Sequence, residues 1–140
     1  MEPSRLPSLI ALIVSISLSQ LAGADEKTDQ AVEAAKSWLG LVDSRHYRES
    51  WQEAAPFFKE KVQEADWVKM IAPVRDPLGD VKSRDLIGAQ YTTSLPGAPQ
   101  GEYVVMQFGT TFQNKPDAVE TVTPMKDGGG VWRVSGYYIK

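Results

Sequence analysis

Extended segments separated only by short turns fill the second half of the chain. In the clearest of them, 102–113, every second residue belongs to a set of mostly large apolar groups: Val104, Met106, Phe108, Thr110 and Phe112. A period of two is typical of a strand that buries one face. The turn-forming sequences PGAPQG, NKPD and DGGG are too short for the crossovers that parallel strands need. We therefore expect consecutive strands to pair antiparallel.

Four strands are predicted in this half. They cover about 81–95, 102–113, 119–125 and 131–139. Gly88 and Gly109 lie inside two of these segments, and a glycine inside a strand often marks a bulge or a bend. The pattern therefore predicts a sheet that curves around whatever covers its apolar face.

Helical periodicity precedes the strands. Between Asp25 and Val42 apolar residues recur at spacings of three and four, which predicts an amphipathic helix with one buried stripe. Acidic residues gather in its expected first turns, where the helix dipole favours negative charge. The segment HYRESWQEAAPFF carries a second stripe. We expect Pro56 to divide it into two short helices, because proline has no amide hydrogen.

The segment EADWVKMIAPVR shows a third helical pattern. The residues that share its apolar face are Trp67, Met70, Ile71 and Val74. Pro77 and Gly79 should end it, since proline cannot continue a helix and glycine tolerates the left-handed backbone common at helix ends. Helices followed by strands predict an α+β fold, with N-terminal helices packed on a curved four-stranded antiparallel sheet.

The first 24 residues have the organisation of a secretory signal peptide. Arg5 gives a short basic start, residues 6–18 are mostly Leu, Ile, Val and Ala, and Ala22-Gly23-Ala24 forms an A-x-A site. A membrane anchor needs roughly 20 consecutive apolar residues, and this run is shorter. We expect cleavage after Ala24 and an exported, periplasmic or secreted single domain over residues 25–140, with no membrane span.

Composition argues against several partners and cofactors. The formal net charge is -3, with 15 basic residues scattered among 18 acidic ones, whereas nucleic-acid binding needs concentrated Lys and Arg. The absence of cysteine removes disulfides, thiolate metal sites and a lipoprotein anchor. One histidine, His46, argues against a transition-metal site and a histidine-based triad. We expect no nucleic acid, no metal and no cofactor.

Four blocks of sequence, in their order, resemble a known family. They are KSWLGLVDSRHYRESWQEAAPFF, VRDPLGDVKSRDL, SLPGAPQGEYVVMQF, and ETV with WRVSGYYI. Together they are similar to the bacterial exported family catalogued as domain of unknown function 4019, from roughly Ala31 to the C-terminus. The resemblance implies a secreted or periplasmic domain of the cystatin-like or nuclear-transport-factor-like cone type, with no established activity. His46 does not sit on a motif position of that family.

Two arginines and three aromatic residues are candidates for a ligand site. Arg75, in a last helical turn, and Arg84, along a strand, either hold an anionic ligand or serve the fold through the helix dipole and a carboxylate. Trp51, Tyr91 and Tyr103 are candidates because an open cone would present aromatic side chains to a ligand. The sequence favours the structural interpretation of the arginines.

Glu120 is the candidate for acid–base chemistry. It lies inside a predicted strand, where a buried carboxylate can have a raised pKa and act as a general acid or base. The competing and favoured interpretation is an ion pair with Arg84, Arg75 or Arg133.

Two functional classes follow from these candidates. The first is a non-catalytic module of the cell envelope that binds a small ligand or a protein. The second is a polyketide-cyclase-like enzyme with Glu120 as its base, an analogy of fold alone. Exposed sheet edges also permit a homodimer through the sheet.

Overall fold

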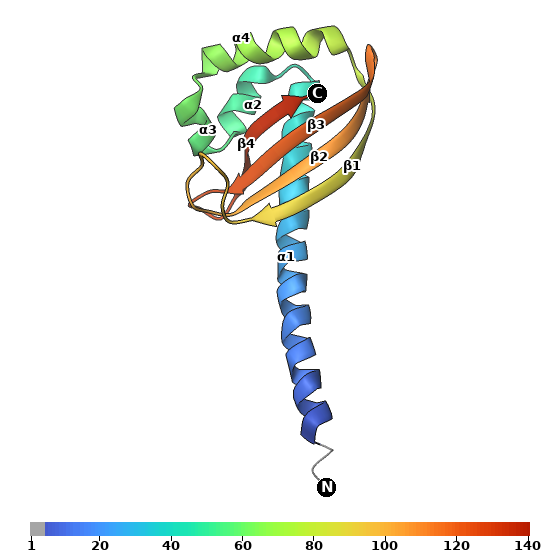
Figure 1. Ribbon diagram of the computed structural model, residues 1–140. Coiled ribbons are helices and arrows are strands. Elements are labelled where there is room, and N and C mark those ends of the chain that lie inside the picture. The colour runs from blue at the N-terminus through green and yellow to red at the C-terminus, as the bar shows by residue number, and fades with distance from the viewer. Residues whose placement is uncertain (1–4) are drawn as a thin grey trace.

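The computed structural model describes residues 5–140. Within that range four α-helices and a short 3-10 turn precede a four-stranded sheet (Figure 1). The helices are α1 (Arg5–Asp43), α2 (Tyr47–Glu53), α3 (Pro56–Lys61) and α4 (Glu64–Arg75), and the 3-10 turn η2 spans Asp76–Leu78. The strands are β1 (Val81–Thr92), β2 (Tyr103–Phe112), β3 (Lys115–Lys126) and β4 (Trp132–Ile139). The predicted α+β class is confirmed.

Helix α1 is longer than predicted. It runs unbroken from Arg5 to Asp43, so the predicted start at Asp25 is wrong for the full-length chain and the acids near it lie inside the helix. The predicted stripe is confirmed, because Val32, Ala35, Leu39 and Val42 are buried. In the described part of the chain, no helix combines the length and apolar character needed to cross a membrane. Residues 1–4 of the predicted signal peptide lie outside the described range, and cleavage after Ala24 stays a prediction.

Prolines and one glycine set the limits of the shorter helices. Pro56 is the first residue of α3, as predicted. Pro73 lies inside α4, which continues beyond it for two residues. Gly79 follows η2 with φ 76°, a left-handed backbone that residues with a Cβ rarely adopt. A Cβ there would also lie 2.8 Å from Oε1 of Gln113, so this turn requires glycine.

The strands form one antiparallel meander in the order β1-β2-β3-β4, as the short turns predict. Strand β2 buries the alternating set that was predicted for it. Strand β3 begins at Lys115, before the expected residue 119, because the turn consists of Gln113 and Asn114 rather than of NKPD. Pro116 is tolerated there because β4 pairs with β3 only from Val119 onward.

The two strand glycines have different roles. The β1–β2 register shifts between Leu86 and Gly88, with Ile87 as the extra residue, which confirms the predicted bulge at Gly88. Gly109 pairs without a register shift on both sides. A Cβ on Gly109 would lie 3.3 Å from Cδ1 of Ile87, so Gly109 makes room for the bulged side chain. Curvature of the whole sheet and the cone type stay predictions.

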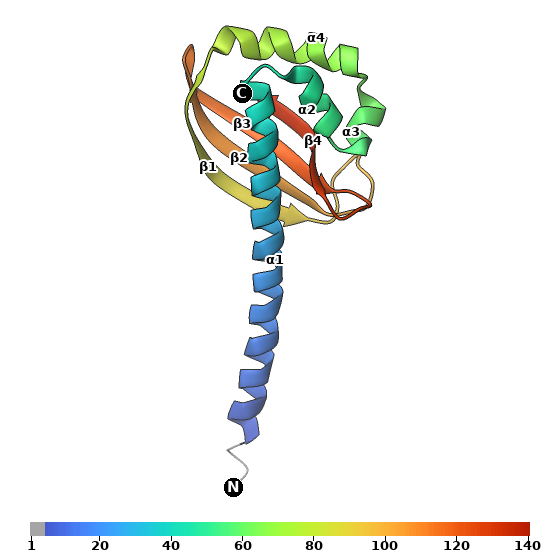
Figure 2. The same ribbon diagram turned by 180° about the vertical axis from the view of Figure 1, so that it is seen from behind.

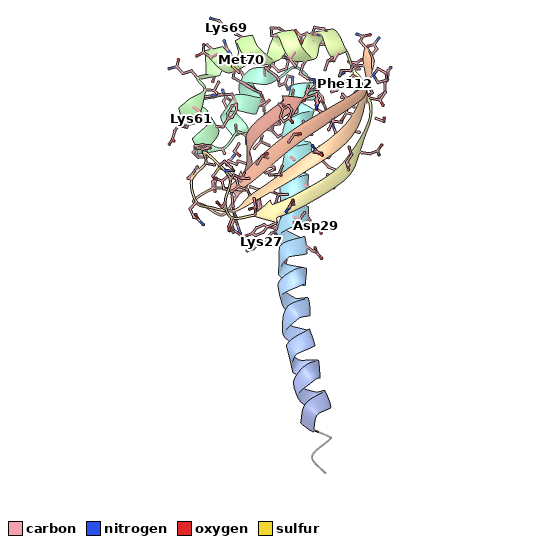
Figure 3. All side chains as sticks on the ribbon, viewed as in Figure 1. Lys27, Asp29, Lys61, Lys69, Met70 and Phe112 are labelled. Carbon is pink, nitrogen blue, oxygen red and sulfur yellow. The ribbon has the colours of Figure 1, made fainter. Side chains whose placement is uncertain are left out.

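The helices cover one face of the sheet. Helix α1 crosses that face in Figure 2, whereas Figure 1 looks onto the other face. Lys27 and Phe112 lie near opposite ends of the covered region (Figure 3). Two buried indoles bind the same serine: Trp38 donates from Nε1 to the carbonyl of Ser50 at 2.8 Å, and Trp67 donates to its Oγ at 2.9 Å. The core therefore joins α1, α2 and α4 through one polar residue.

Candidate functional site

A fully buried carboxylate lies on the covered face of the sheet. Glu120 is on β3, where the alternation places it on the same face as Ala118 and Val122, both buried. Thr110 of β2 donates from its Oγ1 to Oε1 of Glu120 at 2.6 Å, and the hydroxyl of Tyr137 of β4 donates to Oε2. Both neighbouring strands therefore hold this carboxylate.

Arg84 of β1 connects Glu120 with the end of α1. Its Nε lies 2.8 Å from Oε1 of Glu120 and its Nη2 lies 3.2 Å from Oε2. The same guanidinium donates to both oxygens of Asp43, at 2.7 and 2.9 Å. One planar group with five donors thus binds two carboxylates. The predicted ion pair of Glu120 with Arg84 is confirmed, whereas Arg133 instead pairs with Asp127 and Glu53.

Arg75 reaches the same place from the last turn of α4. It is 4% exposed, and its Nη2 donates to Oδ1 of Asp43 at 2.8 Å. Its guanidinium carbon lies 4.8 Å from the ring centroid of Phe112. Two arginines and two carboxylates balance in charge, as burial requires. We call the set Asp43, Arg75, Arg84, Thr110, Glu120 and Tyr137 the ionic cluster.

Burial and paired charges compete in setting the pKa values of the cluster. Burial raises the pKa of Asp43, but hydrogen bonds and charge from Arg84 and Arg75 outweigh it and hold that pKa below its ordinary value of 3.8. Burial lowers the pKa of Arg84, and its two carboxylate partners more than reverse the effect. Burial and the charge of Glu120 raise the pKa of Tyr137. These groups are therefore held in the forms that bind one another.

Acid should weaken the fold through Asp43. Its pKa is lower in the folded protein than the ordinary 3.8, so its contribution to stability is complete above that value and is lost as pH falls through the folded-state pKa. We expect the free energy of unfolding to fall as the pH drops below about 4, and Asp43→Asn to reduce this slope. Urea denaturation at several pH values measures the dependence of the free energy of unfolding on pH. Asp117→Asn, which removes a largely exposed carboxylate, is the control, and equal slopes for all three proteins would contradict the prediction.

The ionic cluster offers little room for a substrate. Each oxygen of Glu120 already accepts two hydrogen bonds. Four surface pockets of residues 5–140 are lined by residues other than Glu120. A general base must come within hydrogen-bond distance of the proton that it removes. The geometry therefore favours a structural role for Glu120.

The three aromatic candidates lie outside the ionic cluster. Trp51 donates from Nε1 to a backbone carbonyl of the α3–α4 connection at 2.7 Å. Tyr91 donates to Glu102 at 2.8 Å. Tyr103 is buried and donates to the carbonyl of Pro99 at 2.5 Å. The structure therefore brings the two candidate arginines together but does not join the aromatic candidates to them.

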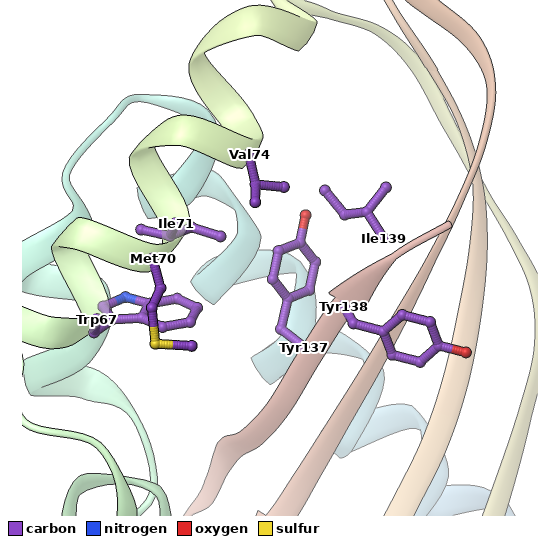
Figure 4. Close-up of a pocket in the computed structure, with 7 residues that line it drawn as sticks. All are labelled: Trp67, Met70, Ile71, Val74, Tyr137, Tyr138 and Ile139. Atoms are coloured by element: carbon purple, nitrogen blue, oxygen red, sulfur yellow. The ribbon is translucent and has the colours of Figure 1, made fainter.

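An apolar groove opens between α4 and β4. Its lining residues are Trp67, Met70, Ile71, Val74, Tyr137, Tyr138 and Ile139 (Figure 4). The volume of the groove is about 200 Å³. Met70 and Val74 are 57% and 47% exposed, although both are large apolar groups. Exposed apolar side chains around a hollow mark an interaction surface more often than isolated ones do. We call this feature the α4–β4 groove.

Among the described residues, part of the backbone of β4 has no hydrogen-bond partner beside this groove. The amide of Ala55 donates to a carbonyl near the start of β4 at 2.8 Å and closes that part of the edge. Val119 and Lys140 exchange both backbone hydrogen bonds. By antiparallel alternation, Tyr137 and Ile139 therefore turn their N–H and C=O groups away from β3. An extended chain beside β4 would find hydrogen-bonding groups there.

The groove was not among the candidate sites predicted from the sequence. The helical pattern correctly placed Trp67, Met70, Ile71 and Val74 on one face of α4. Only Trp67 and Ile71 are buried. The width of this apolar face could have indicated the groove, because a stripe wider than one packing contact leaves some of its apolar side chains exposed. How many remain exposed depends on the separation of α4 and β4 in space.

The acidic and histidine side chains of the described residues do not form a metal site. Across residues 5–140, no three acidic or histidine side chains converge where they could hold a metal ion. His46 is largely exposed between α1 and α2.

The family model described as "Protein of unknown function (DUF4019)" matches residues 34–137, well over half of the chain. No curated protein matches this chain.

Proposed function

We propose that this protein, which belongs to the DUF4019 family, is an exported, non-catalytic binding module of the cell envelope. Its proposed partner is a protein that presents an extended segment with one apolar side chain to the α4–β4 groove. The observation that carries the proposal is a hollow rimmed by exposed apolar side chains beside an unpaired strand edge.

The size of the groove supports a single side chain as the occupant. Small-molecule sites usually enclose about 300–1,000 Å³, and the groove has about 200 Å³. This space suits one aromatic ring or one branched aliphatic group. Burial of such a group contributes about 1.5–3 kcal/mol, which makes a weak contact by itself. Further contacts must therefore come from the backbone of the partner.

The edge of β4 supports those further contacts. In strand addition, main-chain hydrogen bonds provide affinity and a side-chain pocket provides preference. Tyr137 and Ile139 have the required outward backbone groups, and the groove lies next to them. The matching segment is extended and carries an aromatic or branched aliphatic residue without charge at the position above the groove.

The predicted signal peptide supports the location. Cleavage after Ala24 would leave the groove intact, since its lining residues belong to α4 and β4. The resemblance of the sequence to the DUF4019 family supports a curved sheet of the cystatin-like or nuclear-transport-factor-like cone type. In this proposal the ionic cluster has no catalytic part and holds the sheet on which the groove is built.

Side-chain analogues test the groove directly. We expect indole and 3-methyl-1-butanol to shift the methyl signal of Met70 in a ¹H–¹³C NMR titration, with a dissociation constant of about 10–100 mM, which corresponds to the burial energy of one such group. The methyl group of Met106 is fully buried in the core and should not move. Absence of any Met70 shift would contradict the proposal.

Two charge substitutions distinguish the groove from general surface stickiness. Val74→Glu is expected to abolish the Met70 shift, because it places a carboxylate among the apolar lining residues. Leu86→Glu is the matched control, since Leu86 is a comparably exposed apolar residue on β1. A shift that survives Val74→Glu, or disappears in Leu86→Glu as well, would assign the binding to another surface.

A further inference from the structure

One row of residues crosses the sheet face that no helix covers in Figure 1. Gly88 pairs with Gln107, Gln107 pairs with Thr121, and Thr121 pairs with Tyr138. All four lie at the same level along the strands, and strand alternation directs the side chains of Gln107, Thr121 and Tyr138 away from the core. We call these four residues the central row.

The surroundings of the central row are uncharged. The outward residues next to it on the two inner strands are Val105, Gly109, Val119 and Thr123. Charged residues make up 24% of the chain, so their absence from this area is a real depletion, and charge depletion is the compositional mark of an interface core. Among the described residues, Asp85 and Arg133 bring charge to this face from the two edge strands, and Asp117 brings charge to it near the start of β3.

The middle of the row is complementary to itself. Gln107 and Thr121 lie side by side, with Nε2 of the amide 3.5 Å from the threonine Oγ1. An amide and a hydroxyl both donate and accept hydrogen bonds, so the same two groups on a second copy can satisfy them. A strongly charged partner would find no opposite charge here. A two-fold contact places one surface patch against itself, which this composition permits without repulsion.

The ends of the row differ in shape. Tyr138 is 57% exposed at one end. At the other end a Cβ built on Gly88 would meet nothing within 4 Å, and a hollow of about 320 Å³ adjoins Gly88 and Gln107. A two-fold axis parallel to the strands, between β2 and β3, places β4 of one protomer over β1 of the other. Since the row is level, this operation brings the protruding ring over the glycine.

We propose that this face binds a second copy of the chain, with Tyr138 of each protomer in the hollow at Gly88 of its partner. Four strands of about ten residues present roughly 600 Å². Two such faces bury roughly 1,200 Å² in total, which is the lower limit for a stable specific interface. Tyr138 also lines the α4–β4 groove, but the dimer is formed by the central row and does not require a ligand in that groove.

The sheet edges are less suited to self-association than this face. Strand β1 carries Lys82 and Asp85 and is bulged at Ile87, and charges and bulges protect an edge from pairing. The edge of β4 is closed by Ala55 over its first part. The contact between copies is therefore assigned to the face.

Sedimentation equilibrium of the intact protein, purified from the cells that produce it, tests the dimer. We expect a monomer–dimer equilibrium, and at least tenfold weaker association for Gly88→Leu and for Tyr138→Ser. The new leucine has open space around its Cβ, and circular dichroism checks that both variants fold. Gly40→Leu, on the exposed side of α1, is the matched control and should associate as the wild type does. A wild-type monomer at 100 μM, or unchanged association in both variants, overturns the proposal.

Cross-linking tests the pairing of the two protomers. The chain has no cysteine, so introduced thiols report without background. A mixture of Gly88→Cys and Tyr138→Cys chains treated with a short bismaleimide is expected to give a linked dimer. Either variant alone should not, because the proposed axis displaces the same position on the two protomers by three strand spacings, about 14 Å, across the sheet. Efficient linkage of one variant to itself indicates a different axis and overturns the proposed pairing.

Discussion

Arg84→Met is expected to lower the free energy of unfolding by about 3–5 kcal/mol, the usual cost of breaking a buried ion pair from one side. Arg84 is the direct ionic partner of Glu120, which is 0% exposed, and it also binds Asp43. Methionine keeps much of the length of the side chain but supplies no charge and no donor. The carboxylate of Glu120 would then remain buried with only two hydroxyl donors. Urea denaturation at pH 7, followed by circular dichroism, measures the loss.

An exposed ion pair provides the comparison for this variant. Nε of Arg48 lies 3.5 Å from Oε1 of Glu64, and the Arg48 side chain is 80% exposed. Arg48→Met should therefore lower the free energy of unfolding by less than about 1 kcal/mol. A double variant, Arg84→Met with Glu120→Leu, should recover part of the loss, because it removes the unpaired charge together with its partner. If Arg84→Met costs no more than Arg48→Met, the ionic cluster is not a structural element.

Phe108→Ala is expected to cost about 3–5 kcal/mol, since it leaves a cavity in the main core. Phe108 lies on the inner strand β2 and is fully buried. Its core neighbours come from both the helices and the sheet, so the cavity would open between the two layers of the fold. The loss is measured as the change in free energy of unfolding in urea, with the dependence on urea concentration checked for two-state behaviour.

Leu86→Ala is the matched control for Phe108→Ala. Leu86 is the direct cross-strand partner of Phe108 on β1, and it is 43% exposed because β1 is an edge strand. Its truncation should cost about 1 kcal/mol or less. Equal losses at the two positions would mean that β1 is more deeply covered than the structure has it, as would happen if another chain lay over that edge.

The position of the ionic cluster explains why so many elements meet there. Asp43 ends α1, Arg75 ends α4, and the remaining members come one from each of the four strands. Each buried charge can be compensated only when all these elements are in place. The cluster is therefore complete only when the whole fold is assembled. The α4–β4 groove and the central row lie on surfaces that remain exposed in that fold.

Local features of the sequence predicted most of the elements. The alternation in β2 identified its buried face, Pro56 identified the start of α3, and Gly79 identified the end of the helical part. These predictions succeeded because each depends on a few neighbouring residues and on backbone restrictions. The start of β3 was missed, because a proline inside a strand reads as a turn residue unless the end of the neighbouring strand is known.

By itself, the sequence determined the α+β class, the helices from α2 to α4 and the meander of short-turned strands, and it named Arg84 as one of three possible ionic partners of Glu120. Periodicity and turn length act over distances that the chain order already defines. Only the tertiary structure decided that Arg75 and Arg84 share Asp43, that Met70 and Val74 face water, and that Gly88 and Tyr138 end one row. These relations join residues far apart in the chain, and they depend on register and on the spacing between layers, which no local pattern encodes.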